Sequence, residues 1–359
     1  MKSRKIQCLS LLLILAIFSS CKSPNKRLLK TEKASRNTLT ESVFEIDCSI
    51  RALEVEEEAI CWFTGSKNKF GFTKDFGKSW KTHHIDYNGL DLEFRSIALT
   101  DESVFVLSTG EPALLFKINK NTLDYSLVYK ETGERVFYDA MQFWDNKNGI
   151  AIGDPTSDCM SILTTKDGGD TWQKLHCNSL PSAEIGEAAF AASDTNISLV
   201  GKKAFVVTGG KAANILLGNF YGEEWKKIKT PIIQGQSMTG IFSTDFFNEH
   251  IGVIAGGNWK EKNNTNHAMA MTHDGGNSWK LLHENPGFIS CVQFIPKTKA
   301  LLACSTNGIF YSKRLGESWV KISDEAFYNF RFSNNGKQLY FSGNNKLMST
   351  RLNKLLNLH

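Results

Sequence analysis

Six residues have the types needed to hydrolyse a glycosidic bond beside a carboxylate group. Three arginines can hold a substrate carboxylate, and a tyrosine paired with a glutamate can act as the nucleophile. An aspartate can serve as the acid. The residues are Arg51, Arg95, Arg331, Tyr138, Glu187 and Asp139. Glycoside hydrolysis is therefore one hypothesis for this chain.

Other features count against an enzyme. The Arg-Ile-Pro segment typical of sialidases is missing, and the arginines have a structural alternative in ion pairs with Glu93 or Asp139. No CxxC pair, HExxH motif or calcium loop occurs, and no GxGxxG opens a helix. We expect no metal and no cofactor. A sialidase-like glycoside hydrolase is kept as the alternative to a binding protein.

The elements that position these residues are indicated by a repeated box, Ser/Thr-x-Asp-x-Gly-x-x-Trp. The Asp can accept backbone N–H groups in a turn, the Gly permits a left-handed backbone, and the Trp covers apolar surface between sheets. The fourth copy keeps Trp319 but has Arg314 in place of Asp. The structural box residues are Asp75, Trp80, Asp167, Trp172, Asp274, Trp279 and Trp319.

The spacing of the boxes predicts a β-propeller. From Trp80, the steps to Tyr125, Trp172, Trp225, Trp279 and Trp319 are 45, 47, 53, 54 and 40 residues. A period of about 45 residues suits a four-stranded blade. Seven glycine-containing turns repeat in step with it. We predict an all-β, seven-bladed propeller over residues 37–359, whose last blade is closed by an N-terminal strand at residues 42–48.

Sites on propellers gather at one mouth of the central channel, where the glycine turns meet the starts of the innermost strands. The candidate binding mouth comprises Arg51, Arg95, Tyr138, Asp139, Asp154, Glu187, Lys211, Trp259 and Arg331.

Residues 1–20 form a predicted bacterial lipoprotein signal. Lys2, Arg4 and Lys5 precede an apolar run that is too short to span a bilayer. Phe18-Ser19-Ser20-Cys21 resembles a lipobox, so Cys21 is the expected lipid anchor; a plain signal peptide cut nearby is the alternative. Residues 21–36 then form a basic tether. We expect an exported protein on the outer membrane, facing the periplasm rather than the cell exterior.

The net charge of +5 is concentrated at the N-terminus. The signal contributes +3 and the tether +5, so the predicted ring carries about −3. A slightly acidic ring argues against nucleic acid as a partner. We expect a monomer whose partner is a protein complex or a glycan at the membrane.

Cysteine spacing suggests two disulfides in an oxidising compartment. Cys159 and Cys177 are equidistant from Gly168, at the middle of a predicted hairpin. Cys291 and Cys304 are symmetric about Lys297-Thr298. Paired buried thiols are the alternative, because cross-strand disulfides are strained.

The units resemble the photosystem II assembly/stability factor family of BNR-type, seven-bladed propellers. The resemblance is carried by three segments and covers Cys48 to Arg351. The segments are Phe94-Arg95-Ser96-Ile97-Ala98, Phe143 to Gly153 and Thr164 to Trp172. The sequence is most similar to a lipoprotein branch from non-photosynthetic bacteria, some members of which are labelled oxidoreductase. No cofactor motif supports that label here.

This resemblance implies a non-catalytic scaffold that helps to assemble or stabilise a membrane-associated complex. Family members are thought to use an arginine-rich face of the propeller for contact. Only Arg51, Arg95 and Arg331 lie at comparable inner-strand positions, and the ring is slightly acidic.

Overall fold

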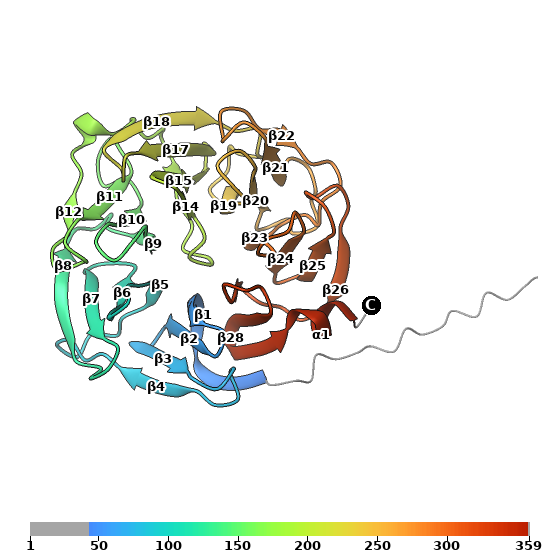
Figure 1. Ribbon diagram of the computed structural model, residues 1–359. Helices are drawn as coiled ribbons and strands as arrows, with labels where there is room; N and C mark the ends of the chain where they lie inside the picture. Colours follow the sequence, from blue (N-terminus) through green and yellow to red (C-terminus); the bar gives the residue numbers. More distant parts are fainter. Residues whose placement is uncertain (1–42, 358–359) are drawn as a thin grey trace, which may run out of the picture. The chain divides into compact units, whose positions relative to one another are not determined.

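The computed structural model describes residues 43–357. The predicted signal peptide, Cys21 and the tether lie outside the described residues. In the described part, antiparallel strands form six hydrogen-bonded sheets arranged around a ring (Figure 1). Within residues 43–357, helical structure is limited to a turn at Cys177–Ser179 and α1 at Leu352–Asn357. No helix among these residues is long and apolar enough to cross a membrane.

The first sheet joins the two ends of the described chain and has six strands. It contains, in spatial order, β27 (Asn329–Phe332), β28 (Gln338–Arg351), β1 (Val43–Glu57), β2 (Ile60–Gly65), β3 (Lys69–Thr73) and β4 (Lys81–His84). The second sheet contains β5 (Phe94–Leu99), β6 (Ser103–Ser108), β7 (Ala113–Asn119) and β8 (Tyr125–Glu131). The third contains β9 (Tyr138–Phe143), β10 (Gly149–Gly153), β11 (Ser161–Thr165) and β12 (Gln173–Lys174).

The other three sheets complete the ring. The fourth contains β14 (Ile197–Val200), β15 (Lys203–Val207), β17 (Asn214–Asn219) and β18 (Glu224–Lys229). The fifth contains β13 (Glu187–Ala188), β16 (Gly209–Gly210), β19 (Thr239–Phe246), β20 (Gly252–Asn258), β21 (Met269–Thr272) and β22 (Lys280–Leu281). The sixth contains β23 (Cys291–Phe294), β24 (Leu301–Ser305), β25 (Gly308–Ser312) and β26 (Val320–Ser323).

The prediction of seven separate blades is corrected to six sheets. The strand expected at residues 42–48 does not end there, but continues as β1 to Glu57. Its first part pairs with β28, with Val43 opposite Met348, and its second part pairs with β2, with Leu53 opposite Phe63. One continuous strand therefore joins the expected first and last blades into a single sheet.

The predicted turns contain the hydrogen bonds that their residue types suggest. The Asp75 carboxylate accepts hydrogen bonds from the N–H of Ser79 at 2.9 Å and from its hydroxyl at 2.6 Å. The Thr73 hydroxyl accepts a hydrogen bond from the N–H of Gly77 at 2.9 Å. Equivalent bonds form at Asp167 and Asp274. In each of the three turns, all of these contacts lie within a few residues of one another in the chain.

The same turns pack against neighbouring sheets. Gly169 has a φ of 79°, and a Cβ added to it would lie 2.3 Å from Cε1 of Phe105 on β6. Gly276 approaches Phe205 of β15 in the same way. Trp172 contacts Phe105 edge-on, with ring centroids 6.4 Å apart. The apolar clusters accordingly lie between successive sheets, rather than in one central core.

The centre of the ring is filled by a segment from its own chain. Residues 192–195, here called the axial segment, precede β14 and reach the middle of the ring (Figure 1). The Asp194 carboxylate accepts hydrogen bonds from the N–H groups of Ile97 on β5, at 3.0 Å, and Met141 on β9, at 3.1 Å. The Ser193 hydroxyl donates to the carbonyl of Ser290, beside β23. Thr195 bonds Ser243 of β19. The predicted channel is therefore closed by hydrogen bonds to several inner strands.

Candidate functional site

Arg51 and Arg95 lie together at the end of the ring where the inner strands begin, here called the strand-start face. The Arg51 guanidinium stacks over the Tyr328 ring, 4.1 Å from its centroid. Arg95 forms an ion pair with Glu93, with 2.7 Å between Nη2 and Oε1. Burial, and next the charge of Arg95, lower the pKa of Arg51. The Nε of Arg51 is buried without a hydrogen-bond partner, so this guanidinium keeps donor capacity.

Two carboxyl groups lie on the same face: Asp139 is near Arg95, and Asp154 is near Asp139. Asp139 is fully buried, and neither of its oxygens has a partner that meets hydrogen-bond geometry, although the backbone N–H of Ala191 faces it. Burial, and next the charge of Asp154, raise the pKa of Asp139 well above its usual range; Arg95 opposes this shift. Burial also raises the pKa of Asp154 to about 6. The strand-start face therefore holds carboxyl groups whose charge is poorly compensated.

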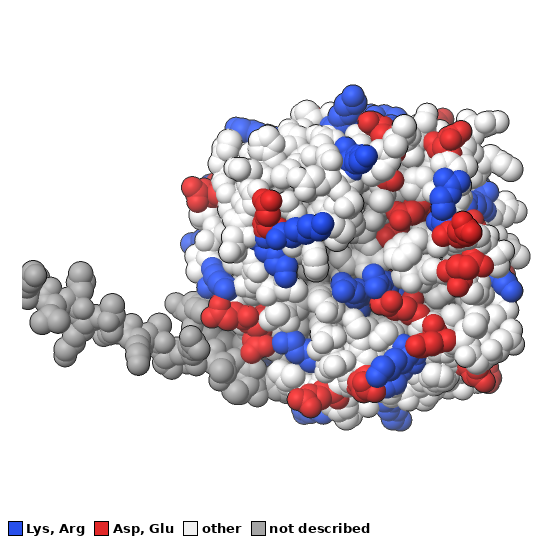
Figure 2. Space-filling view, turned by 180° about the vertical axis from the view of Figure 1, so that it is seen from behind, with Lys and Arg blue, Asp and Glu red and all other residues white. Residues whose placement is uncertain are grey.

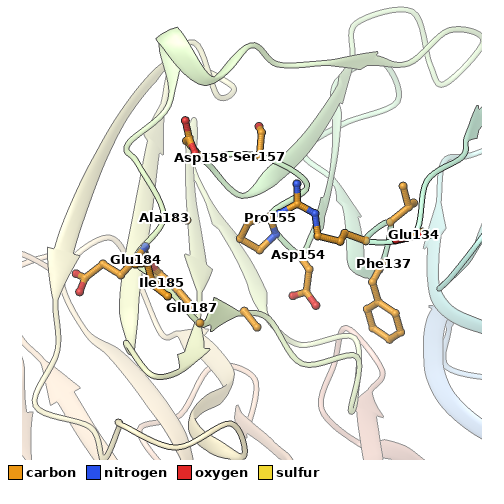
Figure 3. Close-up of a pocket in the computed structure, with 14 residues that line it drawn as sticks. Glu134, Phe137, Asp154, Pro155, Ser157, Asp158, Ala183, Glu184, Ile185 and Glu187 are labelled. Atoms are coloured by element: carbon orange, nitrogen blue, oxygen red, sulfur yellow. Dashed lines mark hydrogen bonds between the residues drawn. The ribbon is translucent and has the colours of Figure 1, made fainter.

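A groove of about 630 Å³ opens beside Asp154. In Figure 3, Glu134 and Phe137 lie on one side, residues 183–187 lie on the other, and Asp154 and Pro155 lie between them. The Asp154 carboxylate accepts a hydrogen bond from the N–H of Ala189 at 2.8 Å, which links the two walls. The groove is thus built by loops of the third sheet and by the chain leading to β13.

Glu187 supports the groove rather than serving as a free acid. Its Oε1 accepts hydrogen bonds from Thr208 at 2.6 Å and Asn214 at 2.9 Å. Its Oε2 accepts one from the N–H of Glu184 at 2.8 Å and lies 3.7 Å from Nζ of Lys227. These contacts hold the loop at residues 183–188 in place.

A disulfide braces the same region. Cys159 and Cys177 are bonded, with a Cα–Cα distance of 5.4 Å. Cys159 also forms a β-bridge with Ser182, and the N–H of Ala183 bonds the carbonyl of Asp158 at 2.7 Å. Backbone contacts therefore tie the wall at residues 183–187 to the segment that follows Asp154, and the disulfide joins the chain next to these contacts.

Several side chains of the strand-start face, both at the groove and beside the start of β19, are open to solvent. Ile185 lines the groove and is 92% exposed. Lys211 packs against Gly186 at the edge of the groove. Trp259 is 45% exposed and lies beneath Nζ of Lys262, at 5.2 Å from the ring centroid. Exposed apolar side chains among charged groups suit contact with another molecule.

Two predicted mouth residues lie elsewhere. Tyr138 is buried between sheets and donates a hydrogen bond to Glu131 at 2.6 Å. Arg331 lies inside the ring, where its Nη2 bonds the carbonyl of Asp194 at 2.9 Å and its Nε is 3.4 Å from Glu54. The three arginines therefore do not surround one pocket, and Tyr138 does not pair with Glu187. The geometry required for the sialidase-like alternative is not formed by these residues.

Sequence reasoning missed the axial segment. Two signals for it were available: the step from Trp172 to Trp225 is longer than the repeat, and Ser193 to Asn196 are small polar residues placed just before a strand. A repeat-based argument assigns extra residues to outer loops. Here they lie on the axis instead.

The second predicted disulfide is also corrected. Cys291 and Cys304 are directly opposite each other on β23 and β24, but both are buried free thiols. They interact with each other through a hydrogen bond. Directly opposed positions on neighbouring antiparallel strands fit disulfide geometry poorly, which explains the difference.

The surface has no extended field of one charge on the face drawn in Figure 2, where acidic and basic side chains alternate. An arginine-rich face is not seen in this view. Among residues 43–357, no group of three His, Cys, Asp or Glu side chains is arranged to hold a metal ion.

Comparisons with known proteins address the fold. No family model matches the chain, and no curated protein matches it in sequence. A structure described as YCF48 bound to D1 peptide superposes with a TM-score of 0.62 at 13% identity, covering 86% of this chain and 96% of that one. The chain is a β-propeller. YCF48 from Cyanidioschyzon merolae gives a TM-score of 0.60 at 12% identity, covering 86% and 99% of the two chains.

The fold is shared more widely. The WD40 β-propeller domain of Doa1 matches with a TM-score of 0.59 at 11% identity, over 86% of this chain and 94% of that chain. At such low identity, the likeness establishes the propeller architecture alone. It agrees with the resemblance to photosystem II assembly factors at the level of fold.

Proposed function

We propose that this propeller is a non-catalytic scaffold that binds an extended segment of a partner protein in the groove of the strand-start face. The groove beside Asp154 carries the proposal, because it combines a preformed volume of about 630 Å³ with an aliphatic side chain, Ile185, that is 92% exposed. A propeller of the same fold is described as bound to a peptide, which supports this class of partner.

The groups around the groove suit a segment that carries charges of both signs. Arg135 lines the groove, and Asp154, which also lines it, has no ion-pair partner among the described residues. Oppositely charged groups on a partner would fix its register and orientation, while contact with Ile185 would contribute apolar burial. The bonded walls of the groove lower the entropy cost of binding, because the loops are already ordered.

We further propose that the chain is an exported lipoprotein of the bacterial envelope, anchored through Cys21 and facing the periplasm. The apolar run before Cys21 and the basic residues after it support this proposal. The Cys159–Cys177 disulfide is compatible with an oxidising compartment. Replacing Cys21 by Ala in the full chain should move the protein from the membrane to the soluble fraction; membrane retention would contradict the anchor.

Site-specific crosslinking tests the groove. A photo-reactive amino acid is placed at position 185 of the full chain and, as a control, at position 320, because Val320 is also exposed, at 56%, but lies on the outer strand β26. We expect a discrete partner to be captured from position 185 and not from position 320. Equal capture at both positions would overturn the assignment of the groove.

The arginines offer a second test of the same surface. The double change Arg51→Ala and Arg95→Ala should weaken capture from position 185. Arg314→Ala should not weaken capture, since Arg314 is exposed and lies in the turn that follows β25. Capture that is unaffected by the double change would remove the arginines from the binding surface.

A further inference from the structure

The opposite end of the ring, where the inner strands finish, contains a second concave region. Two cavities of about 640 and 360 Å³ share five lining residues and therefore form one depression, here called the strand-end depression. The shared residues are Glu54, Val55, Gln142, Asp245 and Asn334. Gln293 on β23 lines the smaller cavity. Inner strands of several sheets thus direct polar groups toward one space.

The unused groups in this depression are hydrogen-bond acceptors. The Oε1 atoms of Gln142 and Gln293 are buried without a hydrogen-bond partner. One carboxylate oxygen of Asp245 accepts a hydrogen bond from the N–H of Phe294 at 2.7 Å. Within residues 43–357, no Lys or Arg lies within ion-pair distance of Asp245. A buried acceptor without a donor loses the hydrogen bonds that water would give it, which is unfavourable for the folded protein.

Two of the cations that line the depression, Arg331 and Lys120, are already engaged. Arg331 bonds Glu54 and the carbonyl oxygens of Phe330 and Asp194. Lys120 forms an ion pair with Glu56 at 2.9 Å, and its side chain is only 9% exposed. Lys297 also lines the smaller cavity, but it forms no ion pair with Asp245 within residues 43–357, so the Asp245 carboxylate and the two Gln oxygens are left without a cationic donor.

We propose that the strand-end depression binds a primary ammonium or guanidinium group. Such a group supplies several N–H donors and a positive charge in a small volume. The Asp245 carboxylate would accept the charged hydrogen bond, and the Gln142 and Gln293 carbonyls would accept further N–H groups. This site lies apart from the groove beside Asp154, so it does not depend on the function proposed above.

The titration of Asp245 provides a signature. Burial raises the pKa of Asp245 to about 7, although the N–H groups of Phe294 and Phe246 and the charge of Arg331 oppose the shift. Glu54 of β1 and Lys297, which follows β23, are the other charged groups that line this cavity. Because only the ionised carboxylate attracts a cation, affinity should fall as the pH decreases through 7.

Calorimetric titration of the full chain with methylguanidinium and with n-butylammonium tests the proposal. We expect saturable binding of both, and no binding of tetramethylammonium, which has the charge but no N–H donor. Affinity should fall at least tenfold from pH 8 to pH 6. Asp245→Asn should weaken binding at least tenfold, whereas the surface change Asp170→Asn should leave it unchanged.

Two additions keep the result decisive. Gln142→Leu is a second variant that should also weaken binding, and it serves as the test if Asp245→Asn does not fold. Circular dichroism checks the folding of each variant. Spermidine and the tripeptide Gly-Lys-Gly then separate a free polyamine from a protein side chain as the source of the cation, with Gly-norleucine-Gly as the uncharged match. Absence of saturable binding, equal binding of tetramethylammonium, or unchanged binding by Asp245→Asn and Gln142→Leu would overturn the proposal.

Discussion

Asp167 and Asp154 both follow strands of the third sheet, yet the pKa values of their carboxyl groups shift in opposite directions at the rim and near the axis of the ring. Asp167 lies in a rim turn, where hydrogen bonds from Thr171 and Thr165 outweigh partial burial and lower its pKa to about 2. Asp154 lies beside the groove, where burial raises its pKa to about 6. The rim stabilises charge with local donors, whereas the axial region leaves charge uncompensated.

This difference separates architecture from binding. The rim turns repeat, and in three of them the Thr hydroxyl accepts a hydrogen bond from the Gly N–H four residues later. The polar groups of these turns that lack a partner are mainly the indole N–H groups of the box Trp residues, such as Trp80 and Trp172. Near the axis, each inner strand contributes different residues, and the polar atoms left without partners include both oxygens of Asp139 and Oε1 of Gln142. Proteins tolerate such costs mainly at functional sites. The repeat therefore marks the scaffold, and departures from it mark the candidate sites.

The largest expected effect comes from breaking the axial network at Arg331. Arg331→Ala leaves Glu54 without its cation and exposes the carbonyl of Asp194 to an unfilled space. Loss of one partner of a buried ion pair costs about 3 to 5 kcal/mol. Chemical denaturation should show this decrease in the free energy of unfolding. Arg314→Ala, whose side chain is 72% exposed, is the control, and a similar loss there would contradict the special role of the axis.

At the rim, Trp172→Ala should cost about 3 kcal/mol, because it removes a large buried ring between two sheets. Thermal denaturation measures the change. Trp259→Ala removes the same side chain from an exposed position and should have little effect on the melting temperature. If the two variants melt alike, the Trp residues of the box do not hold adjacent sheets together.

Asp154→Asn should stabilise the protein at pH 7 by about 3 kcal/mol, since its pKa rises from 3.8 to about 6 and each pKa unit corresponds to about 1.4 kcal/mol. The sign follows from linkage: the folded pKa exceeds the unfolded value, so the stability associated with the protonated carboxyl is present below pH 4 and is lost as the pH rises through 6. Denaturation measured at several pH values between 4 and 7 should show that the free energy of unfolding depends less on pH in the variant than in the wild type. A destabilised variant at pH 7 would contradict the uncompensated charge.

Asp167→Asn should have the smallest effect and the opposite sign, a loss of about 1 kcal/mol at pH 7. Here the folded pKa lies below the unfolded value, so the contribution is present above pH 4 and is lost as the pH falls toward 2. Urea denaturation at pH 7 and pH 3 should show the difference from wild type shrinking at the lower pH. Asp170→Asn is the control, because the exposed Asp170 carboxylate forms an ion pair with Lys117 at the surface, and its effect on the free energy of unfolding should be smaller.

Prediction from sequence was most successful where contacts are local. The bonds of Asp75 reach only to Ser79, so the residue types and their order are enough to infer the turn. Asp139 was expected near Arg95 and Asp154, because the period indicates which strand starts meet, and the charges of both act on its carboxyl group. Tyr138 was misplaced because successive residues of a strand point to opposite faces, and Tyr138 points between sheets, where it packs against Tyr129 and donates a hydrogen bond to Glu131.

The sequence by itself determined the all-β class, the period and the ring. Those follow from patterns that neighbouring residues impose on turns and strands. Only the tertiary structure decided that the centre is closed by residues 192–195, that Arg331 serves this segment, and that β1 merges two expected blades. The bond between Arg331 and Asp194 joins residues 137 positions apart, and that between Asp194 and Ile97 joins residues 97 apart. Contacts of this kind arise only when the whole ring has formed, because no local pattern specifies the partner.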